Sequence, residues 1–349
     1  MVLNRLICFA LLFLPSLALT ADSSHGSAPH LIGEGLAIFW VIPFVGILLS
    51  IAVMPLVALE FWHHNFGKIS LFWAVSLIVP FLIHQGIEIT IYELLHVGLL
   101  EYVPFIILLL SLFTISGGVM LKGTLVGTPL LNTIIIFIGT ALASWMGTTG
   151  AAMLLIRPLI RANEQRKNKV HIIVFFIFLV ANIGGSLTPL GDPPLFLGFL
   201  KGVSFFWTTS AMFAPMLFMV VSLLLIFFGV DTYLYGKEKD IKVDTANNQK
   251  LGIEGSFNLL LLAGVVFGVL LSGFWKPGIT YEIYHVHIEL QNIIRDVLLL
   301  LLTYASWTLT SKEIRKANEY TWFPIIEVGK LFAGIFVTII PAIAILKAG

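Results

Sequence analysis

The chain has 349 residues, of which 58% are hydrophobic and only 11% are charged, and its mean hydropathy is +0.99. Water-soluble domains average about 25% charged residues, so this composition excludes a soluble globular protein and indicates one that crosses a membrane several times. The formal net charge is +1 and no block of like charge occurs. This charge distribution argues against a nucleic-acid or polyanionic partner.

The first 21 residues have the layout of a secretory signal peptide. Arg5 precedes an apolar run over residues 6–19, and a polar stretch follows. Residues 1–21 are therefore expected to be removed, together with the only cysteine, Cys8, and residues 22–35 are expected to form a periplasmic segment. The cleavage point lacks a clean A-x-A pattern, so an uncleaved first helix stays open as an alternative.

Seven uninterrupted apolar runs follow, each close to the roughly 20 residues that cross a bilayer. Two further segments, residues 130–160 and 171–200, are apolar but interrupted by glycine, threonine and proline. The sequence thus predicts an all-α polytopic membrane protein. The uninterrupted runs are 36–59, 69–87, 103–121, 206–230, 257–273, 293–309 and 323–346.

Lysine and arginine are distributed unevenly between alternate loops. One side holds fourteen of them, and the other holds Lys201 and Lys276, with Arg295 just inside the next span. The positive-inside rule makes the first side cytoplasmic, which predicts a bacterial inner-membrane protein whose mature N-terminus is periplasmic. Both ends of segment 130–160 then lie on the cytoplasmic side, so this segment is expected to be a re-entrant hairpin. A kinked full-length helix is the alternative.

The second interrupted segment contains three glycines and three prolines within residues 182–194. Proline lacks the amide donor and glycine is entropically unfavourable in a helix, so the helix from residue 171 is expected to stop and restart before residue 200. Transporters build ion and substrate sites from the backbone groups that such a break exposes. The candidate site combines this break with the hairpin tip and comprises Gly147, Thr148, Thr149, Asn182, Gly184, Gly185, Ser186, Thr188, Pro189, Gly191 and Asp192.

Asp192 is the only acidic residue in the break. An ionised carboxylate in an apolar setting needs water, a partner or a bound cation, so Asp192 is expected to bind a sodium ion or a proton, with Thr148 beside the ion. Capping of the restarting half-helix is an alternative role that the same carboxylate could combine with ion binding. No resident metal or cofactor is expected, and the coupling ion is Na⁺ or H⁺.

The hairpin tip and the break resemble the ion transporter superfamily, which includes NhaD-type sodium/proton antiporters, CitMHS-type citrate transporters and sodium-coupled dicarboxylate carriers. Residues 184–194, GGSLTPLGDPP, are similar to the unwound loop of that superfamily's broken helix, and residues 145–154 are similar to the tip of its first hairpin. Thr148 and Thr149 match in type the hairpin residues that touch a sodium ion and the substrate carboxylate in dicarboxylate members.

This resemblance covers residues 36–346 and implies a homodimer whose subunits contain two repeats of inverted topology. The first repeat, residues 36–230, has three helices, the hairpin, the broken helix and a closing helix, and residues 231–256 form a cytoplasmic linker. The second repeat, residues 257–349, is less than half as long and has only its three helices. The second repeat is therefore incomplete, and we expect the chain to be truncated at its C-terminus.

Secondary active transport is the leading functional hypothesis, with a small ion or a carboxylate as substrate and the lipid bilayer as surroundings. Sodium/proton antiport is favoured because no Lys or Arg lies between Lys169 and Lys201. Uptake of citrate or another carboxylate is the alternative, and a non-transporting truncated membrane protein is the second alternative. No nucleophile, metal or nucleotide motif of an enzyme is found.

Two charge pairs lie in or near predicted spans. Glu327 and Lys330 are one helical turn apart, and Arg295 is next to Asp296. A local ion pair, or snorkelling of the long side chain towards the interface, is expected for each.

Overall fold

The computed structural model describes residues 29, 31–123, 125–238 and 252–349. Among these residues, nine helices are long and apolar enough to cross a membrane. The prediction of an all-α polytopic membrane protein is therefore confirmed. The predicted signal peptide lies outside the described residues, as do the first residues of the predicted periplasmic segment and residues 239–251 of the predicted linker.

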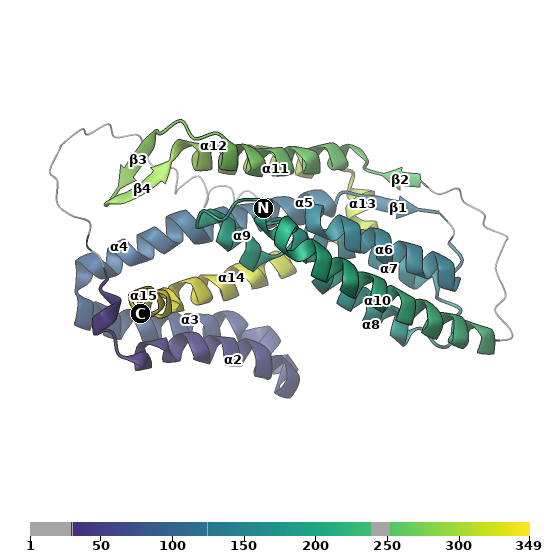
Figure 1. The fold of residues 1–349 in the computed structure, drawn as a ribbon, viewed down its shortest axis with the longest axis horizontal. Coiled ribbons are helices and arrows are strands. Elements are labelled where there is room, and N and C mark those ends of the chain that lie inside the picture. Colours follow the sequence, from purple (N-terminus) through teal and green to yellow (C-terminus); the bar gives the residue numbers. More distant parts are fainter. Residues whose placement is uncertain (1–28, 30, 124, 239–251) are drawn as a thin grey trace. The chain divides into compact units, whose positions relative to one another are not determined.

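The chain forms two compact units, each assembled from segments that are distant in sequence (Figure 1). Of the described residues, those within Met1–Ile106, Gly278–Leu290 and Trp322–Gly349 form unit 1, and those within Ile107–Pro277 and Gln291–Thr321 form unit 2. These units do not follow the predicted repeat boundaries, because the last helices of the chain pack against the first ones.

Unit 1 is built on a long helix with neighbours on two sides. Its elements are the 3-10 turns Gly33–Gly35 and Ile38–Val41, α2 (Ile42–Val57), α3 (Leu59–Gln85), α4 (Ile87–Val97), the π-helical turn Gly98–Tyr102, the strands β3 (Thr280–Ile283) and β4 (Val286–Glu289), α14 (Phe323–Thr338) and α15 (Ile340–Ala348). Helix α3 packs against both α2 and α14, and β3 pairs antiparallel with β4.

Helices α3 and α14 run in the same direction and approach each other closely. The Phe66 and Phe323 rings lie edge to face with centroids 5.9 Å apart, and Ser70 Oγ donates to the backbone oxygen of Lys330 at 2.7 Å. A Cβ atom at Gly334 would collide with Ser70 Oγ. Later residues of α3 thus meet later residues of α14, and a glycine at position 334 permits the close contact.

Two predicted loops of unit 1 are helical. Helix α3 begins at Leu59, so residues 60–68 belong to it, and a single helical span runs from Ile87 to Ser116 across residues predicted as a connection. Hydropathy marks the part of a helix that lies in hydrocarbon. The polar turns of a helix that continue past the bilayer are therefore not recognised as helical by that criterion.

Unit 2 contains the hairpin and the broken helix. Its elements are α5 (Val103–Ser116) for most of its length, β1 (Met120–Lys122), α6 (Pro129–Met146), α7 (Thr148–Ala162), α8 (Val170–Phe176), the π-helical turn Ile177–Asn182, the 3-10 turn Ile183–Leu187, α9 (Pro193–Leu200), α10 (Trp207–Lys237), β2 (Gly252–Glu254), α11 (Phe257–Phe274), α12 (Leu290–Leu309) and α13 (Lys312–Ala317). Helices α6, α7, α8 and α10 lie side by side, and β1 pairs with β2 (Figure 1). Helix α10 extends to Lys237, which lies seven residues into the predicted linker 231–256.

A buried charge network joins the ends of α6, α7, α8 and α10. Arg166 lies 2.6 Å from Asp231 and 3.3 Å from Glu238, and Asp231 also contacts Asn132 at 2.9 Å and His171 at 2.8 Å. The side chain of Asp231 is fully buried and that of Arg166 is 2% exposed. Buried charges need both an opposite charge and hydrogen bonds, and this network supplies both at the base of the hairpin.

A second buried polar cluster joins α11, α12 and α13. Ser306 Oγ donates to Asn258 Oδ1 at 2.7 Å, and Arg315 donates to the backbone oxygen of Ser306 at 2.9 Å. Burial raises the pKa of the nearby Tyr320 phenol to about 12. The phenol therefore stays protonated at neutral pH and hydrogen-bonds to Thr114 at 3.2 Å.

Replacing Arg166 with methionine is expected to lower the free energy of unfolding by about 3–5 kcal/mol, because the buried carboxylate of Asp231 would lose its cation. The matched control is Lys122→Met, which removes the half-exposed ion pair with Glu254 and is expected to cost less than about 1 kcal/mol. Chemical unfolding in detergent micelles measures both values. Equal losses in the two variants would contradict a structural role for the buried network.

Candidate functional site

Gly147 alone makes the turn of the hairpin. Helix α6 ends at Met146 and α7 begins at Thr148, and the φ of +79° at Gly147 is a left-handed conformation that glycine adopts without a Cβ clash. The two ends of the hairpin also meet, because Gly127 N donates to the backbone oxygen of Ala162 at 2.8 Å. The predicted hairpin is therefore observed, and the alternative of a kinked continuous helix is wrong.

The helix that begins at Val170 unwinds in stages. Its α-helical part gives way to the π-helical turn, then to the 3-10 turn that ends at Leu187, and Thr188 is fully extended with φ −137° and ψ 159°. Helix α9 restarts at Pro193. The predicted break is therefore present, and glycine and proline occur where the helical hydrogen-bond pattern changes.

The hairpin and the break are held together by hydrogen bonds that involve the backbone. Thr148 N donates to the backbone oxygen of Gly191 at 3.3 Å, and Leu187 N donates to Ser144 Oγ at 3.3 Å. The hydroxyl of Thr188 donates to the backbone oxygen of Ser144. Backbone groups released by the break thus find partners inside the protein, as membrane depth requires.

Glycine permits the closest approach between the two segments. A Cβ atom at Gly185 would lie 2.7 Å from Thr148 Cγ2 and 2.8 Å from the backbone oxygen of Gly191. Both distances are shorter than van der Waals contact allows. A larger residue at position 185 would therefore crowd Thr148 of the hairpin tip and, within the break itself, the backbone of Gly191.

Apart from Asp192, the predicted site residues divide into those that lie outside the contact between hairpin tip and break and those that form it. Asn182 Nδ2 donates to Ile177 O at 2.9 Å and Ser186 Oγ donates to Ile183 O at 2.8 Å, so both side chains fold back on their own turns. Thr149 is exposed beside the tip, and Pro189 is buried in the loop. The residues that the structure brings together at the junction are Gly147, Thr148, Gly184, Gly185, Thr188 and Gly191.

Asp192 is exposed and occupies the cap position of α9, but its side chain makes no capping hydrogen bond. Pro193 and Pro194 have no amide hydrogen, and the amides of Leu195 and Phe196 donate to the backbone oxygen of Asp192 at 3.1 and 3.3 Å. The capping alternative is therefore wrong, because no free donor is left for the carboxylate. The Asp192 carboxylate accepts no hydrogen bond from any described residue.

Three hydroxyl residues of the junction were missed as site residues. Ser144 Oγ donates to Gly184 O, and the hydroxyls of Thr208 and Thr209 both donate to Leu187 O at 3.0 and 2.6 Å. A serine one turn before the hairpin glycine, and adjacent threonines at the start of α10, were the available signals. Neither pattern is specific without the fold.

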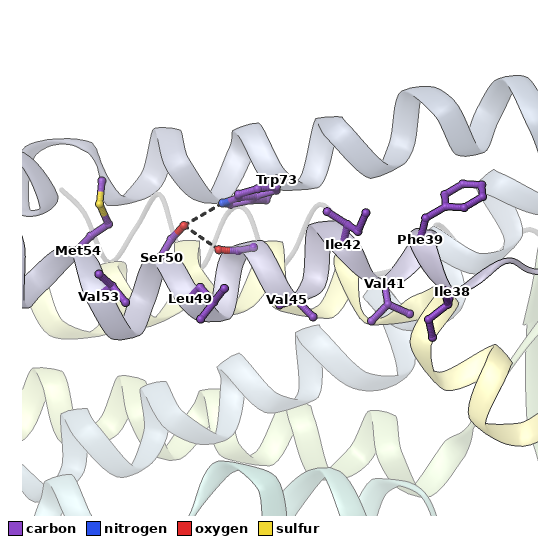
Figure 2. A pocket seen from close by; sticks show the side chains of 11 residues that line it. Ile38, Phe39, Val41, Ile42, Val45, Leu49, Ser50, Val53, Met54 and Trp73 are labelled. Atoms are coloured by element: carbon purple, nitrogen blue, oxygen red, sulfur yellow. Dashed lines mark hydrogen bonds between the residues drawn. The ribbon is translucent and has the colours of Figure 1, made fainter.

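A groove of about 930 Å³ lies between α2 and α3 (Figure 2). Its walls are apolar, and its polar groups bond to each other, since Trp73 Nε1 donates to Ser50 Oγ at 3.0 Å and Ser50 Oγ donates to Gly46 O at 2.7 Å. The groove has the character of a lipid-facing surface and offers no ligand for an ion or a carboxylate. Within the part of the chain that the structure describes, no three His, Cys, Asp or Glu residues gather as a metal site would require.

The family described as "Putative citrate transport" matches residues 33–349. The chain belongs to this family. The match includes both the hairpin and the broken helix, and it confirms the resemblance to citrate transporters that the two stretches indicated. The protein is thus a multi-pass membrane protein of a transporter family. Searches of curated proteins and of solved structures returned no match.

Gly185→Ala is expected to destabilise the protein by about 1–3 kcal/mol, because the added methyl group overpacks the contact between the tip and the break. Gly198→Ala is the matched control within the same broken helix, since a Cβ atom there would meet Val203 Cγ2 at an ordinary 3.7 Å. That variant should be neutral or more stable by up to about 1 kcal/mol. Thermal unfolding in detergent compares them, and a Gly185→Ala variant as stable as the control would refute the steric argument.

Proposed function

We propose that this protein is a secondary active transporter that exchanges sodium ions for protons, with Asp192 as the ion-binding carboxylate. The observation that supports this proposal is the free, exposed carboxylate of Asp192 at the start of α9. A carboxylate that binds either Na⁺ or H⁺, but not both at once, makes the two ions compete. Such competition is the simplest basis for exchange.

The charge of the surroundings also favours a cation. No Lys or Arg lies between Lys169 and Lys201. His171 is at the far end of this segment and is bound to Asp231, in the network at the base of the hairpin. Sodium is a hard cation that prefers oxygen ligands, and the exposed hydroxyl of Thr149 lies beside Thr148, whose amide bonds to the break next to Asp192.

Carboxylate uptake is the second candidate function, and the family description favours it. The first amides of α9 cannot bind an anion, because two residues are prolines and the next two amides are already bonded. A substrate carboxylate would therefore meet α7, whose first turn carries the hydroxyls of Thr148 and Thr149 near the positive end of the helix dipole. In this case Asp192 would bind the coupling cation.

The cellular setting belongs to the same proposal. The lysine and arginine count supports a bacterial inner membrane with a periplasmic mature N-terminus. The superfamily resemblance adds two inverted repeats and a homodimer to this proposal. No enzymatic step and no resident cofactor is part of it.

Asp192→Asn is expected to abolish sodium-dependent proton flux in inverted membrane vesicles, because the amide can neither titrate nor neutralise Na⁺. Glu164→Gln removes an exposed acid of the same unit and should leave the flux unchanged. A pH-sensitive dye inside the vesicles reports the exchange when sodium is added. Wild-type flux from the Asp192→Asn variant would rule out this residue as the exchange site.

Thr148→Val and Thr149→Val are expected to reduce uptake of radiolabelled citrate by about 10- to 150-fold each if a carboxylate is carried, since loss of one hydrogen bond to a charged group costs about 1.5–3 kcal/mol. Thr308→Val is the control, because its exposed hydroxyl bonds only to its own helix. Wild-type uptake in proteoliposomes provides the reference. Citrate uptake that is insensitive to both hairpin variants would remove the hairpin tip from the carboxylate site.

A further inference from the structure

A second groove, of about 510 Å³, lies in unit 1 between the parallel helices α3 and α14. Its lining includes three basic side chains, His64, Lys68 and Lys330, and no carboxylate. The groove shares no residue with the junction of the hairpin tip and the break. Transport at that junction does not account for this group of basic residues.

The two lysines keep most of their hydrogen-bonding capacity. Lys68 Nζ donates to Asn65 Oδ1 at 3.1 Å, and Lys330 Nζ lies 5.5 Å from the centre of the Phe66 ring. An ammonium group has three donors, so each lysine can still bind an anion. Neither lysine lies within ion-pair distance of a carboxylate in the described part of the chain, so the local ion pair of Lys330 with Glu327, one of the two expectations for these residues, is not observed.

The groove changes from basic to apolar along its length. Because α3 and α14 run in the same direction, Leu71 and Ala74 follow Lys68 on one wall, and Ala333 and Val337 follow Lys330 on the other. The distance from Lys330 to Val337 is about 10 Å at 1.5 Å per residue. The basic end therefore leads into an apolar part of the groove that is long enough for the upper part of an acyl chain.

The depth of the basic end matches the membrane interface. Helix α3 has 27 residues and is about 40 Å long, against about 30 Å for the hydrocarbon core. Its first turns therefore project into the headgroup region, and Lys68 belongs to the side that the lysine count makes cytoplasmic. Anionic lipids are attracted to basic groups at this surface.

We propose that this groove binds an anionic phospholipid of the cytoplasmic leaflet. The phosphate group contacts Lys68 and Lys330, and one acyl chain lies along Leu71, Ala74, Ala333 and Val337. A phospholipid carries both an anionic group for the basic end and an acyl chain for the apolar end. A free anion would fill only the basic end, and an apolar helix only the apolar end.

The test is native mass spectrometry of the full chain in detergent, with dioleoylphosphatidylglycerol or dioleoylphosphatidylcholine added. The wild type is expected to retain phosphatidylglycerol selectively. Lys68→Gln with Lys330→Gln should weaken this binding about 25-fold, since each lysine near the surface contributes about fivefold. The control Lys312→Gln with Lys316→Gln removes two exposed lysines of α13 from the same side and should bind as the wild type does.

A second variant tests the apolar end without changing any charge. Ala333→Leu fills the apolar part of the groove and should weaken phosphatidylglycerol binding several-fold while leaving the elution volume of the folded protein unchanged. Equal retention of both lipids by the wild type, or equal effects of the two double variants, would overturn the proposal. Displacement of the lipid by inorganic phosphate would also overturn the proposal, because a free anion would then occupy the basic end. A Leu71→Cys chain that forms disulfide-linked dimers and binds no lipid would overturn it as well, because a second copy of the chain would then occupy the groove.

Discussion

Within a membrane, the backbone groups of the broken helix need hydrogen-bonding partners from the protein. The packing of the hairpin against the break in unit 2 depends on this requirement. Water is not available there to satisfy free amide and carbonyl groups. Ser144 meets the requirement at one point, because its hydroxyl bonds to both Gly184 and Leu187 and its carbonyl accepts from Thr188. The hairpin therefore serves as the hydrogen-bonding partner of the break, and neither segment would be stable in lipid without the other.

The two ends of the hairpin are held by different forces. At the tip the bonds are uncharged and the fit depends on glycine, whereas at the base Arg166 and Asp231 form a buried ion pair. Uncharged hydrogen bonds contribute about 1 kcal/mol each, and breaking a buried ion pair costs several times more. The hairpin is thus anchored firmly at the base and more weakly at the tip, where the candidate site lies.

Much of this fold could be predicted from the sequence. Hydropathy indicates which segments are apolar enough to lie in lipid, and the positions of glycine and proline indicate where helices end. The hairpin and the break are observed as expected. The helical residues 60–68 could not be found this way, since their polar and charged side chains keep the hydropathy of this stretch low. That Asp192 does not cap α9 could have been predicted from the two prolines that follow it. The role of Ser144 could not, because it depends on a hydrogen-bonding partner forty residues away.

The π-helical turn Ile177–Asn182 makes chain length matter as much as residue identity. A π turn holds one residue more than the α-helical turn it replaces, and each residue of an α-helix adds about 100° of rotation. Deleting a single residue from this turn would restore regular α-helix at little cost in local stability. It would also rotate Gly185 and Thr188 away from the hairpin tip, so the register of the junction depends on this one extra residue.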